Sequence, residues 1–286
     1  MSKIRSKEFA LTFVADSNYL PQFSVCVISF LEFHSKAGWS FFLFSDDIEE
    51  KELFPLREKL IQMNNESSVE LVRVNADRFE SFFGFWQNFG KQVFYRFVIP
   101  DHIPIDFKYV LYLDVDIIIN GEFNFEEIKP KNRKPIAAVK DHISDILAPK
   151  RNLTSYFNSG FIVINREYWV SKLFTEKLFK VNPPIRRFAD QDILNEMFKN
   201  NWHELNKEYN YPASKLEYSL SGFKSQNNTR PRVIHFNGGI KPWDYWQKGS
   251  RLYWKFILKS PSKWKFRKAP LSIYKSLEHK LFKSFR

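Results

Sequence analysis

Apolar and polar positions alternate along the first quarter of the chain in a pattern that predicts strands and helices in turn. Residues 9–15 (FALTFVA) form an apolar run that predicts a buried strand, which ends at the polar turn residues starting with Asp16. A helix is predicted over 23–33, after Pro21 at a first-turn position. The pattern continues with a strand over 39–44, a helix over 48–63 and a strand over 69–74. This order indicates a parallel sheet with crossover helices, in which ligands bind at the carboxyl ends of the strands.

Shorter elements continue this pattern as far as residue 236. They are an aromatic helical stretch ending at Val98, strands over 109–113, 136–139 and 160–164, a helix near 169–179, a helix starting at Ala189, and a strand over 232–236 that closes the domain. The expected fold class is therefore α/β, with one large domain and a mostly parallel central sheet.

Composition excludes a disordered chain, because 44% of the 286 residues are apolar and can fill a large core. The chain has one cysteine, Cys26, which lies in an apolar stretch and has no partner for an internal disulfide. This favours a reducing compartment. Neither a signal peptide nor an apolar run long enough to span a bilayer is recognised in the sequence.

The net charge of +12 is concentrated at one end of the chain. Residues 248–286 hold twelve Lys or Arg and one acid, Glu278, which gives +11 and leaves +1 for everything before them. We therefore expect a globular domain over 1–247 and a basic C-terminal tail over 248–286. Nucleic acid is not expected as a partner, because the domain has no basic excess and no reading motif is recognised.

The tail also carries an apolar stripe. From Pro270 onward, apolar residues recur every three or four positions and basic residues recur on another face, which predicts an amphipathic basic helix. Such a helix suits an anionic membrane surface, so we expect a cytoplasmic protein, peripheral on the inner face of the cytoplasmic membrane. The alternative is a helix that packs on the globular domain and leaves its basic face in solvent.

Two carboxylates stand two residues apart in the segment 112–119 (YLDVDIII), at the end of an apolar run. Because side chains of a strand alternate between its faces, Asp114 and Asp116 should point the same way. Crowded carboxylate oxygens repel one another unless a divalent cation lies between them, and Mg²⁺ or Mn²⁺ is the usual one. The alternative is a solvated turn, but the apolar residues that follow argue against it.

The segment 235–243 (HFNGGIKPW) combines an imidazole, two glycines and a lysine. A neutral His235 could complete a cation site with the two aspartates, and Lys241 could neutralise a phosphate oxygen. The glycine pair would let the backbone approach a bulky ligand. Taken alone, such a histidine is more often a hydrogen-bonded core residue, but the nearby pair Asp114 and Asp116 favours the cation-ligand interpretation.

With these motifs in place, the chain resembles glycosyltransferase family 8, the retaining enzymes that include glycogenin and bacterial lipopolysaccharide galactosyl- and glucosyltransferases. Six motifs carry the resemblance in matching order: 15–19 (ADSNY), 95–100 (YRFVIP), 112–116 (YLDVD), 157–165 (FNSGFIVIN), 190–195 (DQDILN) and 235–243. The resemblance implies a single GT-A-type nucleotide-sugar-binding domain, followed here by the basic helical tail.

The resemblance also implies roles for individual residues. The uridine end of a UDP-sugar would contact Ala15, Asp16 and Tyr19. The rest of the donor would contact Arg96, Asp114, Val115, Gly238 and Lys241. The ligands of Mn²⁺, or of Mg²⁺, would be Asp114, Asp116 and His235. The residues around the transferred sugar, implied to be catalytic, are Asp141, Asn158, Asp190 and Gln191.

The activity implied by the resemblance is Mn²⁺-dependent, retaining transfer of galactose or glucose from a UDP-sugar to lipopolysaccharide or another cell-surface glycan. Two alternatives stay open at this point. One is a glycogenin-like enzyme that glucosylates itself, and the other is a nucleotide-sugar-binding protein without turnover. Intact Asp114, Asp116 and His235 argue against the second alternative.

Overall fold

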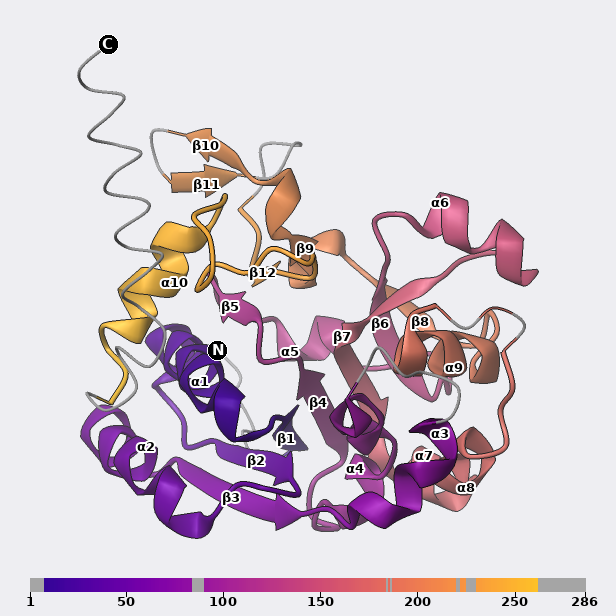
Figure 1. The fold of residues 1–286 in the computed structure, drawn as a ribbon, viewed down its shortest axis with the longest axis horizontal. Helices are drawn as coiled ribbons and strands as arrows, with labels where there is room; N and C mark the ends of the chain where they lie inside the picture. Colours follow the sequence, from indigo (N-terminus) through magenta and orange to yellow (C-terminus); the bar gives the residue numbers. More distant parts are fainter. Residues whose placement is uncertain are drawn as a thin grey trace.

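A seven-stranded sheet runs through the centre of the molecule in the order β3-β2-β1-β4-β7-β6-β8 (Figure 1). The computed structural model describes residues 8–83, 90–183, 185, 187–219, 222–224 and 230–261. The strands of this sheet are β1 (Phe9–Val14), β2 (Ser40–Ser45), β3 (Ser68–Arg73), β4 (Tyr109–Leu113), β6 (Ile136–Lys140), β7 (Phe157–Asn165) and β8 (His203–Leu205). Within this sheet only β7 runs antiparallel to its neighbours, β4 and β6. The expected α/β class and mostly parallel sheet are confirmed.

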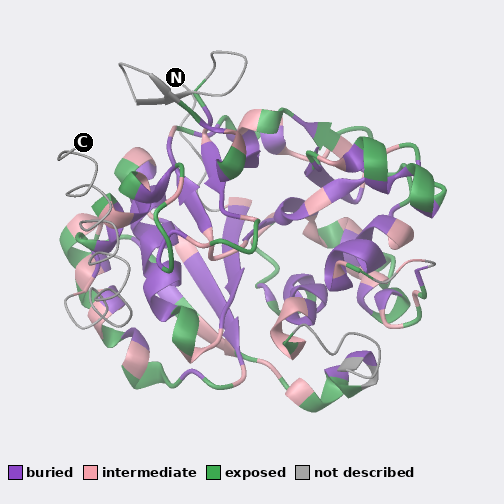
Figure 2. Ribbon diagram, turned by 45° about the horizontal axis from the view of Figure 1, so that its top comes forward, coloured by how far each residue is buried: buried purple, intermediate pink, exposed green. Residues whose placement is uncertain are grey.

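Helices cover both faces of the sheet. The α-helices are α1 (Leu20–His34), α2 (Glu50–Met63), α3 (Glu80–Phe83), α4 (Ile99–His102), α5 (Phe125–Ile128), α6 (Ser144–Leu147), α7 (Arg166–Ser171), α8 (Phe174–Leu178), α9 (Ala189–Met197) and α10 (Ser250–Ile257). The 3-10 helices are η2 (Ser17–Tyr19), η3 (Ala76–Phe79), η4 (Lys91–Phe97), η5 (Pro149–Arg151), η6 (Lys207–Tyr209) and η7 (Ala213–Lys215). Figure 2 shows the inner strands of the central sheet as mostly buried, whereas the edge strands β3 and β8 carry exposed residues.

Two hydrophobic cores lie on opposite faces of the sheet, as the alternation of β1 requires. Leu11 and Phe13 of β1 pack in the core that includes α1 and α10, whereas Ala10 and Val14 pack in the core that includes α4 and α9. The sheet is therefore the middle layer of three, and the ends of its strands are the places left for a ligand site.

A second, small sheet adjoins the carboxyl ends of the central strands (Figure 1). It pairs β5 (Ile117–Ile119), β12 (Val233–His235) and β9 (Tyr211–Pro212), while β10 (Glu217–Ser219) and β11 (Gly222–Lys224) form a separate hairpin. The strand predicted to close the domain thus belongs to this small sheet. It is followed by α10, so the prediction that it closes the domain was wrong.

Two further boundaries differ from the sequence prediction. The helix expected near 169–179 is two short helices, because Leu173 adopts a left-handed conformation with φ 51° between them. This turn brings Thr175 to the indole of Trp169 and the carbonyl of Phe97. The strand expected over 160–164 begins already at Phe157, because Asn158 and its neighbours pair with β6 although their sequence resembles a turn.

Helix α10 packs against α1 (Figure 1), although it lies in the stretch assigned to the tail. Its residues Tyr253, Phe256 and Ile257 are buried in the core. The Ser24 hydroxyl donates to the Ser260 hydroxyl at 3.0 Å, a buried contact just beyond the helix. Packing therefore continues past residue 247.

Two basic residues of this region, Lys255 in α10 and Lys259 just beyond it, are paired with one carboxylate. Lys255 and Lys259 both contact the carboxylate of Glu32, at 3.2 and 2.6 Å. For this part of the tail the packed-helix alternative fits. The amphipathic helix predicted from Pro270 onward lies outside the described residues and stays a prediction. No helix in the described part of the chain is long and apolar enough to cross a bilayer.

The packing of α10 predicts that it contributes to the stability of the whole domain. Phe256→Ala should lower the free energy of unfolding by about 3–5 kcal/mol, the usual cost of emptying a buried aromatic site. Leu258→Ala, at an exposed position one residue beyond α10, should change it by less than about 0.5 kcal/mol. Urea unfolding of both variants measures this, and equal small effects would show that α10 is not part of the core.

Candidate active site

The two aspartates lie in a turn between β4 and β5, where the chain leaves the central sheet for the small one. The backbone N–H of Asp114 donates to the carbonyl of Gly160 on β7 at 2.9 Å. The backbone carbonyl of Asp116 accepts from the N–H of Phe236 at 3.0 Å. The expectation that strand alternation aligns the two side chains was wrong, because the strand ends at Leu113. The turn between two sheets brings them together instead.

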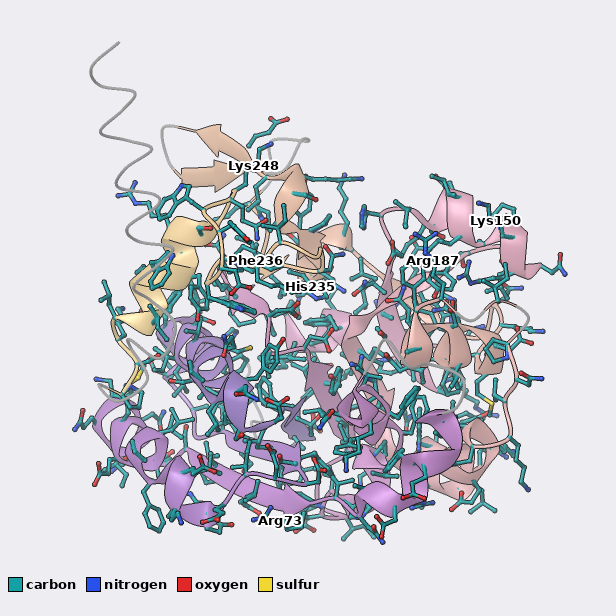
Figure 3. The ribbon with its side chains drawn as sticks, in the orientation of Figure 1. Arg73, Lys150, Arg187, His235, Phe236 and Lys248 are labelled. Atoms are coloured by element: carbon teal, nitrogen blue, oxygen red, sulfur yellow. The ribbon has the colours of Figure 1, made fainter. Side chains whose placement is uncertain are left out.

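His235 reaches the aspartates from β12, the middle strand of the small sheet, at the place where the two sheets meet (Figure 3). Its Nε2 lies 3.1 Å from Oδ1 of Asp116 and 3.6 Å from Oδ2 of Asp114. One ligand atom from each of these three residues lies within 4.8 Å of the other two. Two carboxylates and an imidazole at these separations could hold one divalent cation.

Lys241 adds a positive charge on the other side of Asp116. Its ammonium donates to Oδ2 of Asp116 and to the carbonyl of Phe236, both at 2.6 Å. Burial raises the pKa of Asp116, but the neighbouring His235 ring and Lys241 ammonium outweigh burial and hold that pKa below its usual range. Asp116 is therefore ionised at physiological pH.

Gly160 forms the wall of this cluster with its backbone alone. A Cβ atom at this position would lie 2.7 Å from Oδ2 of Asp114 and even closer to the ring of His235. Only glycine leaves room here for the two side chains to converge. The space that glycine leaves lets Asp114 and His235 approach closely enough to share one cation with Asp116.

Arg96 connects the cluster to α9. It is 8% exposed, and its guanidinium contacts Asp114 at 3.0 Å and Asp190 at 3.0 Å while lying 4.4 Å from the ring centroid of Tyr112. Its Nε donates to the carbonyl of Val93. Burial raises the pKa of Asp190 to about 6, because the loss of water destabilises the charged carboxylate by more than Arg96 stabilises it.

A cleft of about 310 Å³ opens beside these residues, at the ends of β1 and β4. Its lining includes seven of the eight predicted donor residues: Ala15, Asp16, Tyr19, Arg96, Asp114, Val115 and Lys241. Gly238 is not among them. It is exposed in the loop after β12, and no atom lies within 4 Å of the place where its Cβ would stand.

Asp16 and Tyr19 have local roles as well. The Asp16 carboxylate caps η2 by accepting from the N–H of Asn18 at 2.8 Å. The Tyr19 ring is 38% exposed and packs edge-on against Trp243, with the ring centroids 6.1 Å apart.

The four residues predicted around the sugar also meet. Asp141 accepts from the amide of Asn158 at 3.1 Å and from the amide of Gln191 at 3.3 Å. The Gln191 carbonyl oxygen in turn accepts from the N–H of Ser159 at 3.0 Å, and the Ser159 hydroxyl donates to Asp190 at 2.9 Å. Elements β6, β7 and α9 thus contribute to one polar cluster.

Residues 10–247 match the profile described as Glycosyl transferase family 8. The chain belongs to this family. Its family membership agrees with the resemblance found in the six motifs, and the match ends at the residue after which the charge of the chain becomes strongly basic.

Relatives of known name support the same assignment. The chain is 26% identical to Glycosyltransferase GlyB of Streptococcus pneumoniae, over 82% of the chain and 57% of that protein. It is 24% identical to the Lipopolysaccharide 1,2-glucosyltransferase of Escherichia coli K12, over 87% and 77%. The chain thus spans little more than half the length of GlyB.

Among solved structures, the chain is similar to galactosyltransferase LgtC, crystallised with donor and acceptor sugar analogs. The TM-score is 0.69 at 23% identity, and the alignment covers 90% of this chain and 99% of LgtC. This likeness shows the fold, and the expected GT-A-type fold is thereby confirmed.

Sequence reasoning did not single out several residues of the site. Tyr112 donates from its hydroxyl to Asp114 at 2.7 Å, and Ser159 connects Gln191 with Asp190. Both lie inside recognised motifs, so a closer look at those motifs could have found them. Asn210 accepts from the ring of His235 but lies outside every motif, and only the folded chain reveals it.

The backbone wall at Gly160 leads to a prediction about cation binding. Gly160→Ala should weaken Mn²⁺ binding by on the order of tenfold or more, because the new methyl group displaces Asp114 and His235. Calorimetric titration with Mn²⁺ measures the affinity.

Gly121→Ala is a suitable control, since a Cβ there would lie 3.6 Å from Arg232 in ordinary contact. This variant should bind Mn²⁺ as the parent does. Equal affinities for Gly160→Ala and the parent would show that the three side chains do not form the cation site.

Proposed function

We propose that this family 8 member is a retaining hexosyltransferase that moves galactose or glucose from a UDP-sugar to a glycan acceptor with the help of Mn²⁺. The observation that carries the proposal is a convergence. A cation-competent set, Asp114, Asp116 and His235, adjoins a cleft whose wall includes Asp16 and Tyr19. Family 8 membership and the names of the relatives support the reaction class.

The nucleotide end of the donor is proposed to bind between η2 and the turn after β4. Tyr19 offers a half-exposed ring for stacking on the uracil, and Asp16 and Ala15 lie beside it in the same cleft. Arg96 and Val115 would contact the middle of the donor. Gly238, in its exposed loop, would reach the diphosphate through its backbone.

The cation site fits Mn²⁺, with Mg²⁺ as a possible substitute, because its donors are two carboxylate oxygens and an imidazole nitrogen. When bound there, such a cation neutralises charge on the diphosphate as a Lewis acid. Lys241, 2.6 Å from Asp116, can turn its ammonium to the same leaving group as a second positive charge. Departure of UDP then needs no separate acid.

Retention of the anomeric configuration requires attack from the face that UDP leaves. The Gln191 amide is a weak nucleophile, and both of its ends are engaged, with Ser159 and with Asp141. We therefore favour front-face attack by the acceptor hydroxyl, whose proton passes to the departing phosphate oxygen. Asp190 and Gln191 would steady the positive charge that develops on the sugar, and Asn158 and Asp141 would hold its hydroxyls.

The acceptor is proposed to be a lipid-linked or cell-surface glycan such as lipopolysaccharide, used at the inner face of the cytoplasmic membrane. The name of the Escherichia coli relative supports the acceptor class. Attachment to an anionic membrane is proposed for residues 263–286, which hold eight Lys or Arg and one Glu, a net charge of +7. Nucleic acid is not proposed as a partner.

Hydrolysis of UDP-sugars without acceptor tests the proposed chemistry. With Mn²⁺, the protein should hydrolyse UDP-galactose or UDP-glucose, and EDTA should abolish the reaction reversibly. Asp116→Asn should reduce turnover by about a hundredfold or more, because one ionised ligand charge is lost from the leaving-group side.

Asp145→Asn is the matched control, since Asp145 is an exposed carboxylate paired with Lys140 away from the cluster. Turnover that persists in EDTA would contradict metal dependence. UDP binding without hydrolysis of any donor would favour the binding protein over the enzyme.

Deleting 263–286 tests the membrane proposal. Sedimentation with vesicles containing phosphatidylglycerol should fall by more than about tenfold, because each cation near an anionic surface contributes about 1 kcal/mol. UDP-sugar hydrolysis should survive, since the deletion removes no residue assigned to donor or metal. Salt should weaken vesicle binding by the intact protein, since it screens charge over about 8 Å at physiological ionic strength.

Vesicles of phosphatidylcholine alone provide the reference for both proteins. If the truncated protein sediments with anionic vesicles as well as the intact one does, or if the intact one never does, the membrane role is wrong.

A further inference from the structure

A chain of side-chain hydrogen bonds leads from the back of His235 to the residues proposed to hold the sugar. Nδ1 of His235 lies 2.8 Å from the carbonyl oxygen of Asn210. The Asn210 amide nitrogen donates to the carbonyl oxygen of Asn158 at 2.8 Å. The Asn158 amide nitrogen donates to Asp141 at 3.1 Å. Two amides therefore separate the cation site from the Asp141 carboxylate.

The donor and the acceptor of each hydrogen bond in this series follow from the groups at its Asp141 end. The Asp141 carboxylate only accepts, and the backbone N–H of Gly160 only donates, at 3.0 Å to the carbonyl oxygen of Asn158. Asn158 can satisfy both partners in one amide orientation only. Asn210 must then turn its NH₂ group to Asn158 and its carbonyl oxygen to His235. It follows that Nδ1 of His235 carries a proton and donates it to Asn210.

This proton placement leaves Nε2 for the cation site, because a neutral imidazole has one donor and one acceptor nitrogen. Nε2 is the nitrogen that faces Asp114 and Asp116. His235 and Asn210 are only 3% and 7% exposed, so the protein rather than bulk water sets the ring orientation. Asn210 itself lies between η6 and β9, and its N–H is tied back to the carbonyl of Lys207.

We propose that Asn210 is a positioning residue that keeps the proton of His235 on Nδ1 and couples the cation site, through Asn158, to Asp141. The inference rests on the proposed metal-dependent function and adds to it a residue outside all six motifs. Partners that orient a metal-binding histidine in this way typically change metal affinity by about 10- to 100-fold when they are removed.

Two substitutions of Asn210 separate positioning from packing. Asn210→Ala removes the acceptor for His235, so Mn²⁺ affinity should fall by about 10- to 100-fold. Asn210→Asp keeps that acceptor but no longer donates to Asn158. It should bind Mn²⁺ within about threefold of the parent, since the affinity depends on the acceptor alone. With its link to Asn158 and Asp141 broken, the KM for the UDP-sugar should rise or kcat should fall.

Asn206→Ala is the matched control, because Asn206 caps η6 on the same loop and does not contact His235. It should leave Mn²⁺ affinity unchanged. Free Mn²⁺ counted by electron paramagnetic resonance gives the affinities for all four proteins. Equal losses in Asn210→Ala and Asn210→Asp, or no loss in Asn210→Ala, would overturn the proposal in favour of a packing role.

Nuclear magnetic resonance of protein labelled with ¹⁵N-histidine, without metal, separates this inference from the proposed function. A slowly exchanging proton should appear on Nδ1 of His235 in the parent, in Asn206→Ala and in Asn210→Asp, and should be lost in Asn210→Ala. Its absence from the parent, or its persistence in Asn210→Ala, would overturn the positioning role. If the parent shows the proton but binds no Mn²⁺, the proposed function fails and the placement of the proton stands.

Discussion

The buried guanidinium of Arg96 is the contact on which the rest of the site depends. It joins three parts of the chain: η4, on which it lies, the end of β4 through Asp114, and α9 through Asp190. A buried positive charge is tolerated only when it is paired with negative groups. The carboxylates of Asp114 and Asp190 need the guanidinium of Arg96 for the same reason. Removing either partner would leave an uncompensated charge, so the three elements are held together electrostatically.

Around this contact each aspartate of the acid pair has a positively charged side chain beside it, and the ring of His235 lies between Asp114 and Asp116. Asp116 lies between His235 and Lys241, and Asp114 lies between Arg96 and His235. These neighbours reduce the repulsion between the carboxylates that lie close together just beyond the end of β4. His235 lies on β12 and Lys241 lies in the loop that follows this strand. The small sheet presents both at once to the turn that follows β4.

Much of the fold and part of the site followed from the sequence, and the difference has a physical origin. The apolar runs of β1 and β4 and the helix α1 were predictable because burial leaves a periodic record in the sequence. The acid pair and His235 were predictable as a cluster because they are residue types that commonly bind divalent cations. Strand alternation failed at the acid pair because the chain turns there into a second sheet.

Contacts made by the folded chain alone were beyond the sequence. Asn210 reaches His235 across 25 residues of chain, and no local pattern records that approach. The contacts of Arg96 with Asp114 and Asp190 likewise join residues that are far apart in the sequence. The predicted donor residues lie together in one cleft, and their contacts with a sugar nucleotide stay a prediction. The membrane role of the basic tail also stays a prediction.

Gly160 places an unusual limit on how this site could be altered by mutation. Where the wall of a pocket is made of side chains, exchanging one for another reshapes it in small steps. Here the wall behind Asp114 and His235 is bare peptide, and every other amino acid would intrude on both. Natural variation and protein engineering alike must therefore keep glycine at this position and alter the site through other residues.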